Sequence, residues 1–289
     1  MPRLRCSPFR RRAAVLLASL APLAVLAQAA APDAASDTSA GQPKWEAGLV
    51  LGGGWINDYP GADQNHARSL VAPLLIYRGP VLRVDRDGIR GRLLNKRDFE
   101  FDLAASAAFN ARNSDARQGM PGLDYLFGFG PQLIYKGLRN HWGSPTLHLK
   151  ARALMSTDFN HIHGRGVALD PELRWRVSPL AGWPGALTFG VQPTWASRSL
   201  HKYFYEVDAS QATPTRAAYQ ARAGYLGTEL NLTLSRRHSD SLSWFVTARG
   251  MSLHGAANLH SPLLRDTSTL SVGAGVLWTP WHSEARAAD

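Results

Sequence analysis

The sequence of 289 residues predicts an all-β protein, a transmembrane antiparallel up-and-down β-barrel of about 12 strands. Three observations predict it. Apolar residues recur at every second position in many segments, an export signal stands at the N-terminus, and long and short connections alternate between the segments. A period of two is the period of a β-strand, whose successive side chains point to opposite faces. A soluble sandwich would also alternate, but it needs neither the export signal nor the pattern of connections.

Residues 1–29 are a predicted secretory signal peptide. Five arginines precede an apolar run from Ala13 to Ala27, and Ala27-Gln28-Ala29 supplies the small residues of a cleavage site. The apolar run is shorter than the ~20 residues of a membrane-spanning helix. Export with cleavage of the signal is therefore favoured over an N-terminal membrane anchor.

Removing the signal changes the composition of the mature chain. It takes away five arginines and no acidic residue, so 27 Lys and Arg remain against 22 Asp and Glu, and the formal net charge falls from +10 to +5. We therefore do not interpret the basic composition as a nucleic-acid footprint. The single cysteine, Cys6, lies in the signal, so no disulfide or cysteine nucleophile is expected. No other run of 18 apolar residues occurs, which excludes an α-helical membrane protein.

Residues 30–43 are predicted to be a flexible leader, because they are rich in Ala, Asp, Ser, Thr and Pro without periodicity. The barrel is predicted over 44–281. Its first strand is expected from Trp45 through Gly54 and its second at Val71–Tyr77, and the third and fourth flank Asp87-Gly88, a tight-hairpin signal. The other strands are expected around 99–105, 125–135, 147–155, 172–177, 187–195, 219–235, 242–253 and 270–278.

Two of these strands carry charged side chains on one face. Leucines and alanines of 147–155 alternate with His148, Lys150 and Arg152, and Leu173, Trp175 and Val177 alternate with Glu172 and two arginines. Burying unpaired charge is costly, so this face must be wet and the apolar face must point to lipid. The sequence thus predicts an inward row made of His148, Lys150, Arg152, Arg174 and Arg176.

The connections divide into two sets. Long ones are expected near 57–66, 111–122, 157–166, 198–217 and 255–267, and shorter ones near 79–80, 94–97, 137–144, 178–184 and 236–241. In an up-and-down order each set falls at one end of the barrel, apart from the tight hairpin at Asp87-Gly88. Outer-membrane barrels are built in this way, with short periplasmic turns and longer outer loops. Aromatic residues toward strand ends fit interfacial girdles; they are Trp45, Tyr77, Trp195 and Trp278.

Two stretches resemble ion-binding loops only in part. Gly52-Gly53-Gly54 is not followed by the lysine-serine pair of a phosphate loop. Asp85-Arg86-Asp87-Gly88 opens like a calcium loop, but the rest of that loop and its bidentate glutamate are missing. Glycines that let a strand bend, and a hairpin turn, are the preferred interpretations.

Candidate catalytic and metal-ligating residues are few. His161 and His163 could ligate a metal from one side of an extended segment, but no third ligand is evident, and a solvated pair is the preferred interpretation. His238, Ser239 and Asp240 lie in a turn and lack the arrangement of a nucleophile with an oriented base. The sequence therefore predicts no catalytic, cofactor-binding or metal-ligating residue.

Seven short stretches of the mature chain form an ordered set. They are Trp45-Glu46-Ala47-Gly48, 58–63, 73–79, Tyr203-Phe204, 211–219, Ser261-Pro262-Leu263 and Val272-Gly273-Ala274-Gly275. In this order they resemble the MipA/OmpV family of outer-membrane proteins, and the resemblance runs over nearly the whole mature chain. One departure concerns the C-terminus: barrels usually end on an aromatic residue, but 282–289 follow Trp281 and are expected to form a periplasmic tail.

The resemblance implies an outer-membrane barrel of a Gram-negative bacterium, in contact with outer-membrane lipids and lipopolysaccharide. One relative acts as a scaffold between a lytic transglycosylase and a bifunctional peptidoglycan synthase, and others are surface proteins or adhesins. The family has no catalytic motif to carry over. We therefore expect a non-enzymatic scaffold without a nucleic-acid partner. The alternatives are a small anion-preferring solute channel, based on the inward row, a surface adhesin, and a lipid-modifying enzyme.

Overall fold

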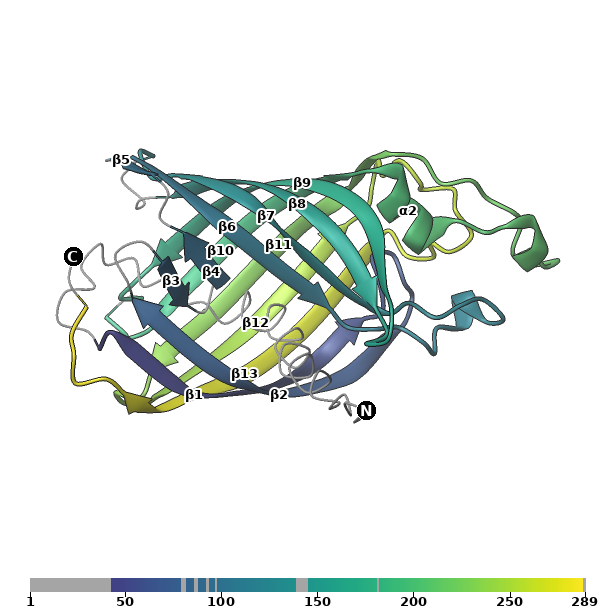
Figure 1. The fold of residues 1–289 in the computed structure, drawn as a ribbon. Coiled ribbons are helices and arrows are strands. Elements are labelled where there is room, and N and C mark those ends of the chain that lie inside the picture. Colours follow the sequence, from purple (N-terminus) through teal and green to yellow (C-terminus); the bar gives the residue numbers. More distant parts are fainter. Residues whose placement is uncertain are drawn as a thin grey trace, which may run out of the picture.

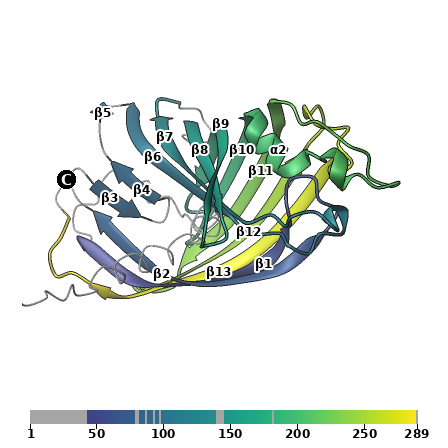
Figure 2. The ribbon, with the colours of Figure 1, turned by 45° about the vertical axis from the view of Figure 1, so that its right-hand side comes forward.

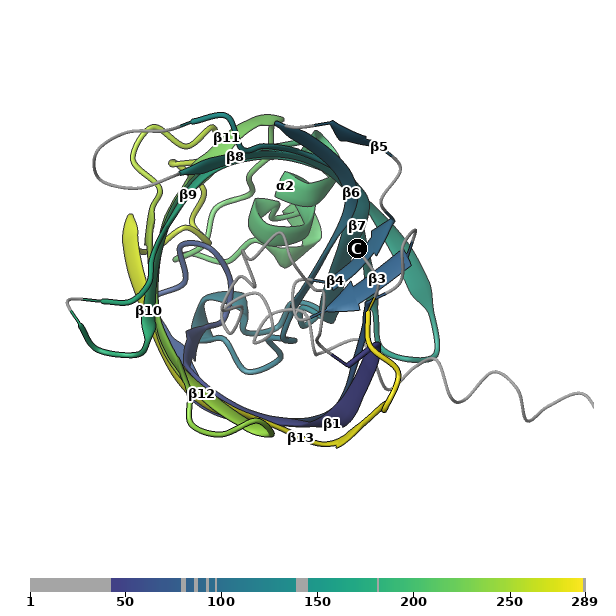
Figure 3. The ribbon, with the colours of Figure 1, turned by 90° about the vertical axis from the view of Figure 1, so that its left-hand side faces the viewer.

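The computed structural model describes residues 43–78, 82–85, 88–91, 94–96, 98–138, 145–180 and 182–287. These residues form one antiparallel sheet of 13 strands in the order β4-β3-β2-β1-β13-β12-β11-β10-β9-β8-β7-β6-β5. β1 pairs with β13, and β4 lies against β6, so the sheet curls into a ring (Figures 1 and 3). The predicted up-and-down β-barrel is confirmed. The predicted signal peptide and all of the predicted leader except Pro43 lie outside the described residues.

Ten strands are long and three are short. The long strands are β1 (Trp45–Asn57), β2 (Asn65–Arg78), β6 (Phe99–Ala108), β7 (Tyr125–Tyr135), β8 (Thr146–Thr157), β9 (Ile162–Val177), β10 (Ala186–Ala196), β11 (Gly224–Arg237), β12 (Leu242–Ser252) and β13 (Ser268–His282). The short ones are β3 (Leu82–Asp85), β4 (Gly88–Gly91) and β5 (Leu94–Lys96). The α-helix α2 (Arg198–Tyr205) and 3-10 turns at Asp115–Arg117 and Ala209–Gln211 lie in connections. The long strands have the ~9–11 residues that a tilted strand needs to cross a bilayer (Figure 2).

The outer wall of the barrel is apolar and the inner wall is mixed. Along β8, Leu149 is 43% exposed, whereas its neighbours His148 and Lys150 are buried. The same alternation continues around the ring, where the exposed apolar side chains include Leu51, Val71, Leu103, Phe129, Leu169, Phe189, Leu230, Leu232, Val246 and Val272. An apolar belt of this extent outside a closed sheet is the lipid-facing surface of an outer-membrane barrel. Among the described helices, none is long and apolar enough to cross a bilayer.

Three expectations about element boundaries are wrong. β9 begins at Ile162, so the connection expected over 157–166 is only four residues long. The strand register shifts between Leu154 and Met155, opposite Gly164 to Gly166, and Gly166 has φ +92°, which lets β9 bulge and continue. The strand expected from about Tyr219 begins at Gly224 instead, and the connection expected over 94–97 contains the short strand β5.

The two ends of the ring are joined beyond the strands. Ser283 exchanges hydrogen bonds with Trp45, since its backbone N–H donates to Trp45 O at 2.9 Å and its Oγ accepts from Trp45 N at 3.1 Å. Pro43 and Arg286 form an isolated β-bridge. His282, predicted to begin the tail, thus belongs to β13, and Ser283 to Arg286 are held beside Pro43 to Trp45. Asp87 lies outside the described residues, but β3 and β4 pair as the hairpin predicts.

Gly130 in β7 lies too close to the backbone of β8 for a side chain to fit. A Cβ at Gly130 would lie 1.9 Å from Ala151 O, a backbone atom that cannot move without displacing β8. We expect Gly130→Ala to destabilise the barrel by about 1–3 kcal/mol, as overpacking does elsewhere. Gly164→Ala is the matched control, because a Cβ there meets nothing within 4 Å. Urea unfolding in detergent micelles measures both, and equal loss in the two variants would contradict this assignment.

Candidate functional site

A hydrophobic cluster lies in one mouth of the barrel. α2 starts after Ser197 and points Leu200, Tyr203 and Phe204 to one side, as residues three and four apart do on a helix. These side chains join residues of three connections and of the adjoining barrel wall in one buried cluster. Figures 1 and 3 show α2 at this end of the barrel. Its members are Tyr59, Ala62, Ala111, Leu123, Leu126, Leu154, Ala168, Ala196, Leu200, Tyr203, Phe204, Tyr205, Leu226, Leu253, Ala256 and Leu264. We call this cluster the plug.

Hydrogen bonds between distant segments hold the plug in place. The Tyr205 hydroxyl donates to Pro60 O at 2.9 Å, and the Tyr59 hydroxyl donates to Leu263 O at 2.7 Å. Ser261 Oγ donates to Tyr205 O at 2.7 Å, and Arg117 Nη1 donates to Phe204 O at 3.0 Å. α2 is therefore tied to the β1–β2, β6–β7 and β12–β13 connections. The connection expected over 198–217 thus contains a helix, and the apolar spacing of 200, 203 and 204 after a serine is the signal that could have revealed it.

Burial shifts the titration of several plug side chains. It raises the pKa of Tyr59 and of Tyr203 to about 12, and it raises the pKa of Tyr205 well above its ordinary value. Burial also lowers the pKa of His201, whose Nε2 lies 3.1 Å from Gly224 O. The tyrosines of the plug and the neighbouring His201 are thus kept in their neutral forms.

Alkaline pH is expected to loosen the plug. An unfolded tyrosine ionises near pH 10, whereas Tyr59 and Tyr203 keep their protons to about pH 12. Their contribution to stability is therefore full below pH 10 and is lost as the pH rises toward 12, by roughly 1.4 kcal/mol per tyrosine at pH 11. Urea midpoints at pH 9 and pH 11 measure the loss. Tyr59→Phe should reduce it, and an unchanged loss in that variant would contradict the assignment.

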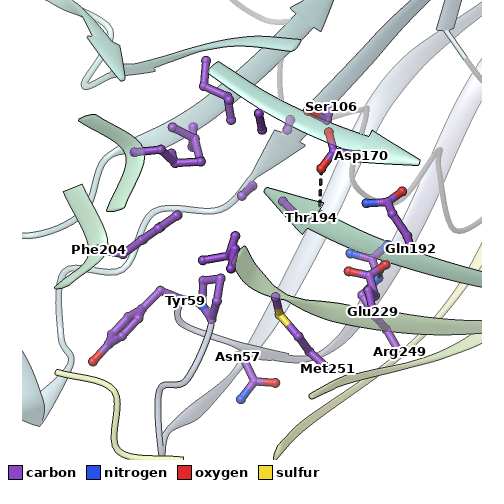
Figure 4. Close-up of a pocket in the computed structure, with 18 of the residues that line it drawn as sticks. Asn57, Tyr59, Ser106, Asp170, Gln192, Thr194, Phe204, Glu229, Arg249 and Met251 are labelled. Atoms are coloured by element: carbon purple, nitrogen blue, oxygen red, sulfur yellow. Dashed lines mark hydrogen bonds and ion pairs between the residues drawn. The ribbon is translucent and has the colours of Figure 1, made fainter. Parts of the chain in front are cut away.

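A polar chamber of about 260 Å³ lies inside the barrel beneath the plug (Figure 4). Its wall on the side of the plug includes Phe204, Leu226 and Met251. Its other walls carry charged and hydrogen-bonding groups from β8 to β13, among them Lys150, Arg152, Asp170, Glu172, Arg174, Gln192, Thr194, Glu229, Asn231, Arg249 and Ser271. The chamber is therefore apolar toward the plug and polar below it.

Charges in the chamber are paired across neighbouring strands. Lys150 Nζ on β8 donates to Glu172 on β9 and, at 2.9 Å, to Gln192 Oε1 on β10. Arg152 Nη2 lies 2.6 Å from Asp170 Oδ2, and Thr194 Oγ1 donates to Asp170 Oδ1 at 2.8 Å.

Two further ion pairs complete the network. Arg174 Nε contacts Glu172 Oε1 at 3.1 Å, and Arg249 Nε contacts Glu229 Oε1 at 3.0 Å. The carboxylates of Asp170, Glu172 and Glu229 offset most of the positive charge of the lysine and arginines facing them. The polar lining of the barrel is therefore close to electrically balanced.

The predicted inward row lies on the inner wall, but it is not a free cationic surface. His148 and Lys150 are buried, and Arg152 and Arg174 line the chamber. Arg176 Nη1 is buried as well. The pairing with Asp170 is not visible in the sequence, because the register of β8 and β9 decides which residues face each other. Two acidic residues and one basic residue at alternate positions, Asp170, Glu172 and Arg174, were the available signal.

The two histidines considered as metal ligands lie at the exposed tip of the β8–β9 hairpin. The His161 and His163 rings stack with centroids 6.4 Å apart. Asp158 accepts backbone hydrogen bonds from Asn160 and His161, which lower its pKa to about 2. Among the described residues no group of three or more His, Cys, Asp or Glu side chains could hold a metal ion. His238, Ser239 and Asp240 form the exposed β11–β12 turn, where His238 N donates to Leu242 O at 2.8 Å.

Comparisons with known proteins place the chain in a family. A crystal structure of an outer membrane channel from Pseudomonas putida F1 is similar with a TM-score of 0.42 and 12% identity, covering 84% of this chain and 98% of that chain. A comparison with curated proteins finds no significant match. The profile of the family described as MltA-interacting protein MipA matches residues 49–280, from β1 to β13. This outer-membrane β-barrel therefore belongs to the MipA family.

Proposed function

We propose that the protein is a non-enzymatic outer-membrane scaffold that docks peptidoglycan-remodelling enzymes. The observation that carries the proposal is the plug: a hydrogen-bonded hydrophobic cluster fills the mouth that carries the long connections, and the chamber next to it has paired charges. A closed and braced barrel suits a rigid docking body better than a free aqueous pore. The family description names an interaction with MltA, which supports a lytic transglycosylase as one partner.

The end of the barrel with short turns is the proposed docking end. The β11–β12 turn exposes Arg237, His238 and Asp240, and the segment held along β1 exposes Glu284. β13 lies between β12 and β1, so the turn and this segment are at the same end of the barrel. In the usual orientation of outer-membrane barrels, short turns face the periplasm, where peptidoglycan lies.

A crosslinking pull-down of the full chain from native envelopes, analysed by mass spectrometry, tests the proposal. Peptidoglycan synthases and lytic transglycosylases should be enriched, and the triple change Arg237→Ala, His238→Ala and Asp240→Ala should reduce their recovery. The matched control is Thr213→Ala with Thr215→Ala, two exposed positions in the connection between α2 and β11, at the opposite end of the barrel. Recovery of only lipopolysaccharide and bulk porins would reject the scaffold.

A small anion-preferring channel is the second candidate function. It is favoured by the three cations that line the chamber from two adjacent strands, Lys150, Arg152 and Arg174. Their pairing with Glu172 and Asp170 weakens that preference, and a continuous path must also pass the plug. Planar-bilayer recordings decide the question: anion-selective steps support the channel, and a silent or cation-selective record rejects it.

A further inference from the structure

Two prolines face each other across the β9–β10 ladder. The pairs Leu169↔Trp195 and Leu173↔Val191 fix the register, which places Pro171 opposite Pro193. Between these pairs the ladder has no pairing over residues 170–172 of β9 and 192–194 of β10. Neither proline has a backbone N–H to donate to the other, and proline is ordinarily kept out of central strands for this reason. We call this interruption the seam.

A second interruption lies in the β7–β8 ladder, on the other side of the β8–β9 hairpin. β7 and β8 are paired at Phe129↔Ala153 and again at Gln132↔Lys150, and between them Gly130 and Pro131 have no partner on β8. The β8–β9 ladder itself has a continuous register through the same level, with Leu149↔Pro171 and Ala151↔Leu169. The β8–β9 hairpin is therefore a coherent unit that is bonded less completely to the strands on either side.

Side chains brace the seam from inside the barrel. Thr194 Oγ1 on β10 donates to Asp170 Oδ1 on β9, directly across the interrupted pairs. Lys150 reaches from β8 over β9 to Gln192 on β10 and also binds Glu172. Gly190 leaves room for this contact, since a Cβ there would lie 2.9 Å from Glu172 Oε1. At the seam, bonds between side chains lining the chamber thus join the strands where backbone bonds are missing.

A groove on the lipid-facing wall lies next to the seam. It has a volume of about 450 Å³ and is lined by small or apolar residues, including Ala151, Ala153, Val167, Leu169 and Trp195. Leu169 and Trp195 are also the last pair before the seam. Arg152 and Ala168 line both this outer groove and the inner chamber. A single layer of sheet therefore separates the two spaces.

We infer that the seam is a lateral portal through which a single-chain zwitterionic amphiphile passes its head group between the membrane and the chamber. The plug fills the mouth with the long connections, and the seam offers the head group a second route, through the wall. The chamber offers both signs of charge next to the seam, Lys150 and Arg152 with Asp170 and Glu172, which suits a head group carrying both charges. The alkyl chain stays in the apolar outer groove. This role is additional to the proposed scaffold.

Fluorescence quenching in lipid bilayers tests the portal. The full chain carries Cys6→Ser and Thr269→Cys, and a small fluorophore is attached at position 269, which lines the chamber. The probe is lysophosphatidylcholine with a nitroxide on its head group. We expect saturable quenching in this parent. In Pro171→Val with Pro193→Val, which restores two N–H donors, the apparent association constant should fall about tenfold, as two added backbone hydrogen bonds favour the closed seam.

Matched variants distinguish passage at the seam from a general loosening of the sheet. Pro73→Val should leave quenching unchanged, because Pro73 is an exposed proline in a β1–β2 ladder that is continuous. Thr194→Val removes the brace to Asp170 and keeps both prolines, so quenching should become faster. The portal is rejected if the parent shows no saturable quenching, if the double valine variant binds as the parent does, or if Thr194→Val does not accelerate quenching.

Discussion

Glu172→Gln is expected to destabilise the barrel by about 3–5 kcal/mol, the usual cost of leaving a buried charge without its partner. The carboxylate of Glu172 accepts hydrogen bonds from Lys150 and Arg174, and the Lys150 side chain is only 2% exposed. Glutamine keeps the size of the side chain but removes the charge that both cations face. The free energy of unfolding in urea, followed by tryptophan fluorescence in micelles, measures the loss.

Two further variants test whether charge is the cause. Glu229→Gln breaks a pair with Arg249 in which both side chains are about a quarter exposed, so its cost should stay below about 1 kcal/mol. Lys150→Met combined with Glu172→Gln removes the buried cation together with its partner and should recover most of the lost stability. If the double variant is as unstable as Glu172→Gln alone, the ion pair is not what stabilises this wall.

Tyr205→Ala is expected to lower the free energy of unfolding by about 3–5 kcal/mol and to open the mouth that contains the plug to ions. Tyr205 is 0% exposed, lies 5.9 Å from the Phe204 ring between centroids, and bonds Pro60 through its hydroxyl. Removing the ring leaves a cavity where α2 and two connections meet. Planar-bilayer conductance and urea unfolding measure the two effects, and we expect ion current in the variant well above that of the parent.

The matched control keeps the ring. Tyr205→Phe loses only the hydroxyl hydrogen bond to Pro60, so we expect a cost of about 1 kcal/mol and a mouth that stays closed. Lys202→Gln, on the exposed side of α2, should change both quantities little, because the Lys202 side chain is 58% exposed and its amide replacement can still donate to Glu206. Equal current in Tyr205→Ala and Tyr205→Phe would show that the plug does not seal the mouth through its packing.

The long strands could be predicted because a membrane makes each of them alternate. Leu149 and Leu232 face lipid while their neighbours face the chamber, so the period of two is strong over whole strands. It fails where backbone geometry decides the outcome. Gly164 and Gly166 have the composition of a loop, but they form a bulge that lets β9 start at Ile162. The short strands β3 and β4 were predicted from the Asp87-Gly88 turn signal and not from a period, and β5, with three residues, is too short for a period to be recognised.

The site was predictable only in part, because pairing between strands is not visible within one strand. The inward direction of His148, Lys150 and Arg152 follows from their alternation with apolar residues. The partner of Arg152 does not, since Asp170 faces it only in one register of β8 and β9. Likewise, α2 combines a polar face with the buried Leu200 and Phe204, which bury against loops far away in sequence.

The joint between the first and last strands has a consequence for the order of folding. Trp45 bonds Ser283 across 238 positions of sequence, and β1 pairs with β13 along the same joint. Closing so long a loop is entropically unfavourable until the intervening hairpins have formed, so the ring closes late. Before that step β1 and β13 each have an unpaired edge, with which a strand of another chain can form backbone hydrogen bonds. Assembly of this barrel therefore passes through an open sheet whose two edges must be protected until they meet.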